Sequence, residues 1–343
     1  MKKRKVMILG FGGTIAQAPD KNGILKPAKS IEDIIGIVPS LKEMADVKFF
    51  ELENLDSTNL NPNHWKKLIL HIQKIHDKVD AILITHGTDT MAYTASAVSL
   101  ALGRGLKIPI VFTGSQLPLI SYGTDAKFNL ENSMKTLLEA CNENIAEVMI
   151  VFNDRVLRGS RAIKTSEASF LAFDSPAFPY LARIDAVGIH FIPEALKVNK
   201  KSILKIKSNF QRGILAVELS PGLEPDILLE TIKSKKCHGL LLKSFGAGNV
   251  PIEGEYSLLP VIREAVNVLK LPVLISTKFV NGKTHMGIYE TGKKALDAGA
   301  IPTGDLTDVM AQVKLMWALG QGHTSLEDLK KVINTDFVGE ITV

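Results

Sequence analysis

Cysteine, aromatic residues and long apolar runs are all scarce in this sequence, and each shortage excludes a class of protein. Its two cysteines, Cys141 and Cys237, lie far apart with no partner at metal-finger spacing, so we expect neither a disulfide framework nor a structural zinc site. Only 6% of the residues are aromatic and the formal net charge is +5, which argues against a nucleic-acid groove. No run of about 18 consecutive apolar residues occurs, so no membrane span is predicted.

The rest of the composition is that of an ordinary globular protein. With 343 residues, 45% of them hydrophobic and 22% charged, the chain is long enough for two domains of roughly 100–200 residues each. Its start resembles a secretory signal, because the basic residues 2–5 precede an apolar stretch and Ala16-Gln17-Ala18 resembles a cleavage site. Glycines and Thr14 interrupt that stretch, so we expect an uncleaved, cytoplasmic protein.

Short apolar runs alternate with longer stretches of helical periodicity along the whole chain, a pattern typical of parallel sheets covered by helices on both faces. We predict strands at residues 6–9, 47–52, 81–85, 109–113, 147–152, 214–218, 239–242 and 273–276. We predict helices at residues 62–76, 90–102, 126–140, 224–235, 257–269, 291–298, 307–319 and 325–333.

The predicted fold class is α/β, with two α/β domains. Residues 1–190 would form the larger N-terminal domain around a doubly wound, mostly parallel sheet, and residues 211–343 a smaller C-terminal domain with a flavodoxin-like parallel sheet. Residues 191–210 would link them, because the lysine-rich stretch 197–207 has no clean helical face and is typical of a solvated connector. In open α/β sheets the active site lies at the carboxyl ends of the strands, so we expect the functional residues in the loops there.

The loop after the first strand is rich in glycine. Gly10-Phe11-Gly12 begins a dinucleotide-binding fingerprint, but its third glycine position holds Ile15, whose branched side chain would prevent close packing of helix on strand. No P-loop lysine follows either. The glycines instead leave exposed N–H groups and the hydroxyl of Thr14, which is either a turn cap or a reactive group.

The loop after the strand at residues 81–85 carries three polar residues in a row, Thr88, Asp89 and Thr90. Helix capping would explain any one of them. Three together exceed what a cap requires, and a carboxylate beside hydroxyls at a helix N-terminus could bind a zwitterion.

Taken together, these loops resemble those of the bacterial-type L-asparaginase family, and the chain is most similar to its cytoplasmic type I branch. The likeness runs nearly end to end. Motifs that carry it are Gly12-Gly13-Thr14-Ile15-Ala16, Asp56-Ser57-Thr58, His86-Gly87-Thr88-Asp89-Thr90-Met91, Thr113-Gly114-Ser115-Gln116-Leu117-Pro118, Arg158-Gly159-Ser160-Arg161-Ala162-Ile163-Lys164 and Lys243-Ser244-Phe245-Gly246-Ala247-Gly248-Asn249.

The resemblance implies a hydrolase that converts L-asparagine and water to L-aspartate and ammonia through an acyl-enzyme, without cofactor or metal. Thr14 would be the nucleophile, supported by Thr88, Asp89 and Lys164, with Lys164 moving protons through the Thr88 hydroxyl. Without the resemblance, Lys164 would belong to a basic run, residues 158–164, typical of a solvated face.

Substrate-binding residues follow from the same resemblance. Asp89 would anchor the substrate ammonium and Ser57 its α-carboxylate, while Thr58 fills a neighbouring position that varies among relatives. The backbone N–H of Thr88, with a group near Ser115, would stabilise the oxyanion.

One departure from the family concerns a tyrosine. Many relatives carry it after a glycine in the loop following the first threonine, whereas here Gly23 precedes Ile24, which cannot donate or relay a proton. Either the loop register differs here or another phenol substitutes, for which Tyr289 is the candidate, although a tyrosine flanked by glycines is more often a packed turn residue. In the family the neighbouring subunit's second domain closes the site, so we expect a homo-oligomer, either a dimer or a dimer of dimers.

A second departure concerns regulation. Some type I enzymes bind a second asparagine through a threonine and an arginine at positions that here hold Ile163 and Lys243. Isoleucine has no hydroxyl and lysine cannot form the two-point clamp of arginine, so we expect weak or absent cooperativity.

Three other functions stay open at this point. The related subunit of a glutamyl-tRNA amidotransferase shares these motifs, but it carries an extra N-terminal domain, for which a first strand near residue 5 leaves no room. Glutaminase side activity is plausible, because one methylene is worth only about 1–3 kcal/mol of discrimination. The chain could also be a binding protein without activity. The presence of all four polar groups, Thr14, Thr88, Asp89 and Lys164, argues against this.

Overall fold

The structure is a computed structural model that describes residues 3–19, 25–27, 36 and 38–342. It divides into two compact units, Met1–Ser208 and Asn209–Val343, so the division falls within the segment 191–210 that was expected to link the domains. The five lysines between residues 197 and 207 are exposed. Backbone hydrogen bonds from Val198 to Asn144 and from Lys207 to Ala101 nevertheless hold this segment against unit 1.

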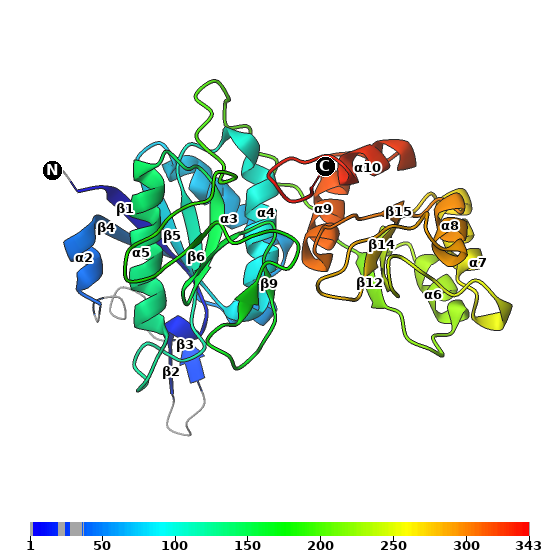
Figure 1. Ribbon diagram of the computed structural model, residues 1–343, viewed down its shortest axis with the longest axis horizontal. Coiled ribbons are helices and arrows are strands. Elements are labelled where there is room, and N and C mark those ends of the chain that lie inside the picture. The colour runs from blue at the N-terminus through cyan, green and yellow to red at the C-terminus, as the bar shows by residue number, and fades with distance from the viewer. Residues whose placement is uncertain (1–2, 20–24, 28–35, 37, 343) are drawn as a thin grey trace. The chain divides into compact units, whose positions relative to one another are not determined.

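Unit 1 is built on a seven-stranded sheet in which five neighbouring strands are parallel, and the next strand along, β8, pairs antiparallel with both of its neighbours (Figure 1). This confirms the predicted mostly parallel sheet. The strand order is β11-β8-β7-β6-β5-β1-β4. The five parallel neighbours are β1 (Lys5–Phe11), β4 (Asp46–Glu53), β5 (Ala81–His86), β6 (Ile110–Thr113) and β7 (Val148–Phe152). Strand β8 (Arg155–Arg158) runs against them, and the edge strand β11 (Ala182–Arg183) pairs antiparallel with β8.

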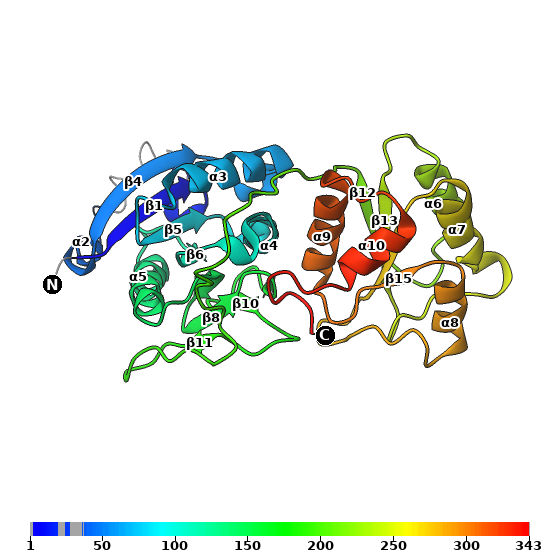
Figure 2. The ribbon, with the colours of Figure 1, turned by 90° about the horizontal axis from the view of Figure 1, so that it is seen from above.

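Helices cover both faces of this sheet (Figure 2). Helices α2 (Ser40–Met44) and α5 (Ala126–Asn142) contact each other on one face, and α3 (Pro62–Ile75) and α4 (Met91–Leu102) on the other. Every residue of β5, β6 and β7 is buried as a result, which explains why these strands appear in the sequence as continuous apolar runs rather than alternating ones.

The order of the strands in unit 1 reverses at β1. From β1 the chain first forms β4 on one side and then crosses to the other side to form β5. Connections that leave adjacent strands toward opposite faces open a crevice at their carboxyl ends, where ligands of such sheets bind. This switch point of unit 1 lies between the loops that follow β1 and β5, the two loops with threonine motifs.

Several short elements of unit 1 were not predicted. They are helix α2, the 3₁₀ turns η1 (Thr14–Ala16), η2 (Ser57–Asn59), η3 (Thr88–Thr90) and η4 (Gly103–Gly105), the hairpin strands β2 (Gln17–Pro19) with β3 (Leu25–Pro27) and β9 (Ile163–Lys164) with β10 (Phe173–Asp174), and strands β8 and β11.

Unit 2 contains a four-stranded parallel sheet in the order β12-β13-β14-β15. Its strands are β12 (Ile214–Glu218), β13 (Gly239–Ser244), β14 (Val273–Thr277) and β15 (Ile301–Pro302). Residues of α6 (Pro225–Ile232), α7 (Leu259–Arg263) and α8 (Glu290–Asp297) share one apolar core with this sheet. Helix α9 (Asp308–Gly320) contacts β12, β13 and β14, and α10 (Leu326–Ile333) packs on α9. The predicted helix at 257–269 is α7 continued by a π-helical turn, η6 (Glu264–Val268), and η5 (Gly254–Tyr256) precedes it.

A buried ion pair lies among the described residues of each unit. In unit 1 Arg158 contacts Glu147, and burial raises the pKa of the Glu147 carboxyl against the opposing effect of the guanidinium. In unit 2 the Lys314 Nζ lies 2.7 Å from Glu340 Oε1, with both side chains wholly buried. The same ammonium donates to the carbonyl oxygens of Ile333 (3.0 Å) and Thr335 (2.6 Å), so it ties the chain end to α9.

Candidate active site

Four neighbouring strands, β6, β5, β1 and β4, end at one edge of the unit 1 sheet, and their loops pack directly on one another. A Cβ atom on Gly13 would lie 2.4 Å from the backbone nitrogen of Gly87, and one on Gly87 would lie 2.5 Å from Ser57 Oγ. A Cβ atom on Gly114 would lie 2.4 Å from the His86 carbonyl oxygen. Only glycine allows these approaches, so the glycines of the sequence motifs serve close loop packing.

Thr14 and Thr88 occupy equivalent places in two of these loops. Each follows a glycine at the end of its strand and begins a 3₁₀ turn, η1 or η3. Because Gly13 and Gly87 are in contact, the two threonines start from adjoining points of the backbone. Gly13 has φ +101°, a conformation that strains any other residue, and it turns the chain into η1. Thr14 is partly exposed there.

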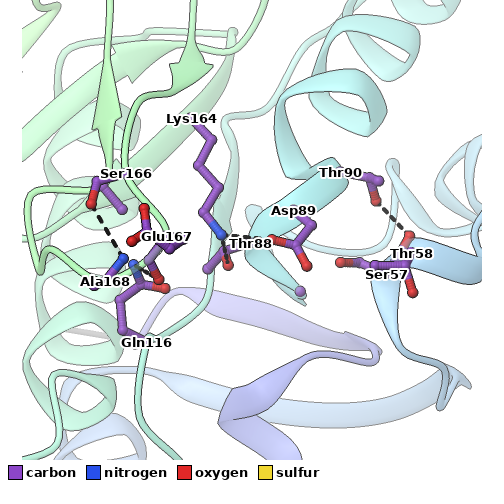
Figure 3. A network of polar contacts seen from close by, with 12 residues as sticks. Ser57, Thr58, Thr88, Asp89, Thr90, Gln116, Lys164, Ser166, Glu167 and Ala168 are labelled. Atoms are coloured by element: carbon purple, nitrogen blue, oxygen red, sulfur yellow. Dashed lines mark hydrogen bonds and ion pairs between the residues drawn. The ribbon is translucent and has the colours of Figure 1, made fainter.

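Lys164 joins Thr88 and Asp89 (Figure 3). Its Nζ lies 2.8 Å from Thr88 Oγ1 and 2.6 Å from Asp89 Oδ1. The lysine comes from β9, where it pairs with Phe173 of β10, and only 16% of its side chain is exposed. Thr88 is buried, whereas 55% of the Asp89 side chain is exposed and can meet a charged ligand. A hydroxyl, an amine and a carboxylate therefore share one hydrogen-bonded cluster.

The capping explanation for the three polar residues is wrong. Neither η3 nor α4 has a side-chain hydrogen bond at its N-terminus. Thr88 and Asp89 contact Lys164 instead, and the Thr90 hydroxyl donates to the backbone carbonyl of Ser57 at 2.8 Å (Figure 3). The last bond ties the loop after β5 to η2, so all three side chains organise the site.

The basic run at residues 158–164 is not a solvated face. Arg158 is 3% exposed and Arg161 is 1% exposed. Both guanidinium groups lie over the ring of Phe178, with 4.3 and 5.2 Å from the guanidinium carbon to the ring centroid. Arg158 is also paired with Glu147. The two arginines anchor the segment, and the lysine that follows them reaches the site.

Other expected binding residues lie at the same edge. Ser57 is 2% exposed and faces Gly87. Thr58 is exposed and donates its hydroxyl to Asp56 at 2.8 Å. Ser115 is buried and donates its hydroxyl to the Leu117 carbonyl at 2.6 Å. The single hydroxyl proton of Ser115 is therefore already engaged, which leaves its side-chain oxygen as an acceptor.

Two residues that sequence reasoning left without a role hold the loops in place. The Gln116 side chain donates to the carbonyl oxygens of Glu167 (2.9 Å) and Ser169 (3.0 Å), which joins the loop after β6 to the hairpin that carries Lys164 (Figure 3). The buried Asp125 carboxylate accepts the backbone N–H groups of Gln116 and Leu117. No local pattern reveals the first contact, because its partners lie 51 and 53 positions away.

The residues at which this sequence departs from the asparaginase pattern lie in different parts of the chain. Gly23 and Ile24 lie outside the described residues. Tyr289 directly precedes α8 in unit 2 and is 57% exposed, so the packed-turn explanation for it is wrong. Lys243 is paired with Asp308, with 2.5 Å between Nζ and Oδ2.

The described residues contain neither a candidate metal site nor a candidate membrane span. There, no group of three or more His, Cys, Asp or Glu side chains could hold a metal ion. Within the same residues, no helix is long and apolar enough to cross a bilayer.

Comparisons with known proteins cover both units. The family model "Asparaginase, N-terminal" matches residues 5–197, and "Glutaminase/Asparaginase C-terminal domain" matches residues 214–333. L-asparaginase from Thermococcus kodakarensis is 34% identical over 342 residues, which cover 98% of this chain and 99% of that protein. One subunit of the glutamyl-tRNA(Gln) amidotransferase from Aeropyrum pernix is 30% identical, over 99% of this chain and 80% of that protein.

A solved structure extends the agreement to three dimensions. The crystal structure of L-asparaginase I from Vibrio cholerae superposes with a TM-score of 0.87 at 31% identity, over 99% of this chain and 100% of that one. The fold and these matches define the class, an amidohydrolase of two α/β domains. The chain belongs to the asparaginase family, as its motifs suggested.

Proposed function

We propose that this protein is an L-asparaginase, which hydrolyses the side-chain amide of L-asparagine to give L-aspartate and ammonia. The observation that carries the proposal is the cluster of Lys164, Thr88 and Asp89 beside the loop of Thr14. It supplies a candidate nucleophile, a proton carrier and a counter-charge at the crevice of a parallel sheet.

The reaction begins with the Thr14 hydroxyl, which is a weak nucleophile until its proton is removed. The Thr14 oxygen bonds to the amide carbon while its proton passes to the Thr88 hydroxyl, whose own proton passes to the Lys164 nitrogen 2.8 Å away. Asp89 stabilises the charge that Lys164 gains, at 2.6 Å. The tetrahedral intermediate then expels ammonia, the returning proton joins the leaving nitrogen, and water releases aspartate from Thr14.

Binding of the substrate uses the exposed side of the same cluster. The substrate ammonium would meet the half-exposed Asp89 carboxylate, and the α-carboxylate would meet Ser57, with Thr58 beside it. The backbone N–H of Thr88 would donate to the oxyanion. Ser115 would accept a hydrogen bond from the substrate amide N–H₂, because its own hydroxyl proton is engaged elsewhere.

Unit 2 would contribute through a second copy of the chain. Tyr289 would supply the phenol that Ile24 cannot, and its exposure allows it to reach a neighbouring molecule. The working enzyme would then be a homo-oligomer in the cytoplasm, acting on a small-molecule substrate without cofactor or metal.

Ammonia release tests this proposal. Purified protein is given L-asparagine or L-glutamine over a concentration series, and ammonia is measured in a coupled assay. We expect turnover of asparagine, with kcat/KM for glutamine lower by about 10- to 200-fold, the range that one methylene allows. Protein that binds asparagine but releases no ammonia would contradict the proposal. Equal turnover of both amides would contradict the asparagine specificity alone.

A further inference from the structure

His86 ends strand β5 directly before the site, and the reaction proposed for Thr14 does not use it. It is completely buried. Its ring lies between the rings of Phe11 and Phe112, with centroids 5.6 and 5.9 Å away. Neither neighbour can donate or accept a conventional hydrogen bond in the plane of the imidazole, so the two ring nitrogens must find their partners elsewhere.

Both ring nitrogens have hydrogen-bond partners outside the two phenyl rings, and these partners determine which nitrogen carries the proton. Nδ1 lies 2.7 Å from the Gly87 carbonyl oxygen, which can only accept. Nδ1 therefore carries the hydrogen. Nε2 lies 2.8 Å from the Thr94 hydroxyl, which can donate to it. Burial lowers the pKa of His86 to about 4, so the ring is neutral at any pH near neutrality.

The carbonyl that His86 holds belongs to the same peptide group as the Thr88 N–H. A trans peptide is planar, and its C=O and N–H point in opposite directions. Fixing the Gly87 carbonyl toward the interior therefore fixes the Thr88 N–H toward the opposite side. Thr88 begins the turn η3, whose first N–H groups have no partner within the turn.

Residue 87 has to be glycine, and this makes the restraint necessary. A Cβ atom there would collide with Ser57, at 2.5 Å from its Oγ, and would lie only 3.3 Å from the Gly13 Cα. Glycine removes the collision but also removes the steric limits on backbone rotation, so a peptide that follows it can turn more readily than any other. The hydrogen bond from a rigid, packed imidazole compensates for that freedom.

We propose that His86 is a positioning residue, whose Nδ1–H holds the Gly87 carbonyl so that the Thr88 N–H points at the oxygen of the reacting amide. That oxygen becomes negative in the tetrahedral intermediate, where a preoriented donor acts most strongly. This role rests on the proposed function of Thr14 and Thr88. It predicts that His86 affects the chemical step more than the binding of asparagine.

Two amide substitutions distinguish the role of Nδ1 from that of Nε2. In His86→Asn the side-chain N–H₂ takes the place of Nδ1 and can still donate to Gly87, whereas in His86→Gln it takes the place of Nε2 and cannot. We expect kcat for asparagine to fall by about 10- to 100-fold in His86→Gln, less than the roughly 10²- to 10³-fold loss on removing an oxyanion donor. In His86→Asn most of the wild-type kcat should remain. KM should change by less than about threefold in both, because ground-state binding does not need the donor.

Thr94→Val is the matched control, because it removes the partner of Nε2 and leaves the Nδ1 bond in place. It should alter kcat by less than about threefold even if it lowers the melting temperature. Equal kcat in the Asn and Gln variants would overturn the proposal, as would a loss in Thr94→Val as large as that in His86→Gln. A change in KM with unchanged kcat would overturn it as well.

A measurement on the wild-type protein keeps the proposal testable if the variants do not fold. Two-dimensional ¹H–¹⁵N spectra of histidine-labelled protein report the tautomer of each ring, and contacts to Phe11 and Phe112 assign His86. We expect the neutral Nδ1–H tautomer at pH 7, and an Nε2–H tautomer would overturn the proposal. Wild-type protein that releases no ammonia would contradict the proposed function, whereas this spectrum tests the hydrogen bond independently of activity.

Discussion

Two lysines, one in each unit, make ion pairs of nearly equal length and differ in everything around them. Lys314 in unit 2 is wholly buried, and three fixed acceptors take up the three N–H donors of its ammonium. Lys164 in unit 1 is 16% exposed on its side chain, and its partners are a hydroxyl and a carboxylate that is itself 55% exposed.

The difference shows why an ion-pair distance alone does not identify a functional lysine. An ammonium with every donor used and no access to solvent holds segments of chain together. A lysine that contacts a hydroxyl at the edge of the active site can exchange a proton with it. The same substitution at the two positions should therefore have opposite consequences.

Lys164→Met should give the largest change. It removes the proton carrier but leaves the buried methylene volume, so we expect kcat/KM for asparagine to fall by at least about 10³-fold. The free energy of unfolding should change by less than about 1 kcal/mol, because the partner carboxylate is mostly exposed. Steady-state kinetics and urea unfolding measure the two effects. Activity within tenfold of wild type would show that Lys164 does not carry the proton.

Lys314→Met should show the reverse. It leaves Glu340 charged, buried and without its counter-ion, so we expect the free energy of unfolding to fall by about 3–5 kcal/mol. Activity per folded molecule should stay within about twofold of wild type. Thermal and urea unfolding give the first quantity, and assays normalised to folded protein give the second. Unchanged stability would contradict the structural role of this pair.

Tyr289→Phe asks whether the chemistry is confined to unit 1. We expect kcat to fall by about tenfold or more, the scale of a lost proton-transfer group, with stability unchanged because the ring is 57% exposed. Tyr256→Phe provides the control, since Tyr256 lies in the same unit, is 41% exposed and has no proposed role. Equal rates for both variants would remove Tyr289 from the mechanism.

Lys243 is more exposed than Lys164 and Lys314, and the effect expected from it, on the shape of the rate curve, is the smallest. Its ammonium is paired with Asp308 and is neither buried nor part of the cluster. Because that carboxylate already occupies it, and Ile163 has no hydroxyl, a second asparagine should not bind there. We expect a hyperbolic rate curve with a Hill coefficient of about 1. A sigmoidal curve for the wild-type protein would contradict this.

The parallel sheets could be predicted from the sequence because strands that are buried on both faces consist of uninterrupted apolar residues. Residues 81–85 and 148–152 are of this kind. Strand β8 and the hairpin β9–β10 could not, because they are short and carry charged residues whose burial depends on distant partners. Arg158, for example, is buried beside Glu147 and Phe178.

For the site, the resemblance implied that Lys164 acts with Thr88 and Asp89, but the residue types alone did not, because Thr88, Asp89 and Thr90 have the composition of a helix cap. The contact of Thr90 with the Ser57 carbonyl is shown by the fold alone. The contribution of Gln116 depends on a hairpin 51 positions away, so no local pattern could predict it. Hydrogen-bond partners that are distant in sequence are set by tertiary structure rather than by propensity.

The central claim is that the Thr14 hydroxyl attacks the amide. Its most direct test compares ammonia release from L-asparagine by wild type, Thr14→Ala and Thr14→Ser, each checked for folding by its melting temperature. We predict that Thr14→Ala lowers kcat by at least about 10⁴-fold while asparagine still binds, and that Thr14→Ser, which keeps a hydroxyl, retains measurable turnover. Turnover by Thr14→Ala within tenfold of the wild-type rate would show that the nucleophile is elsewhere.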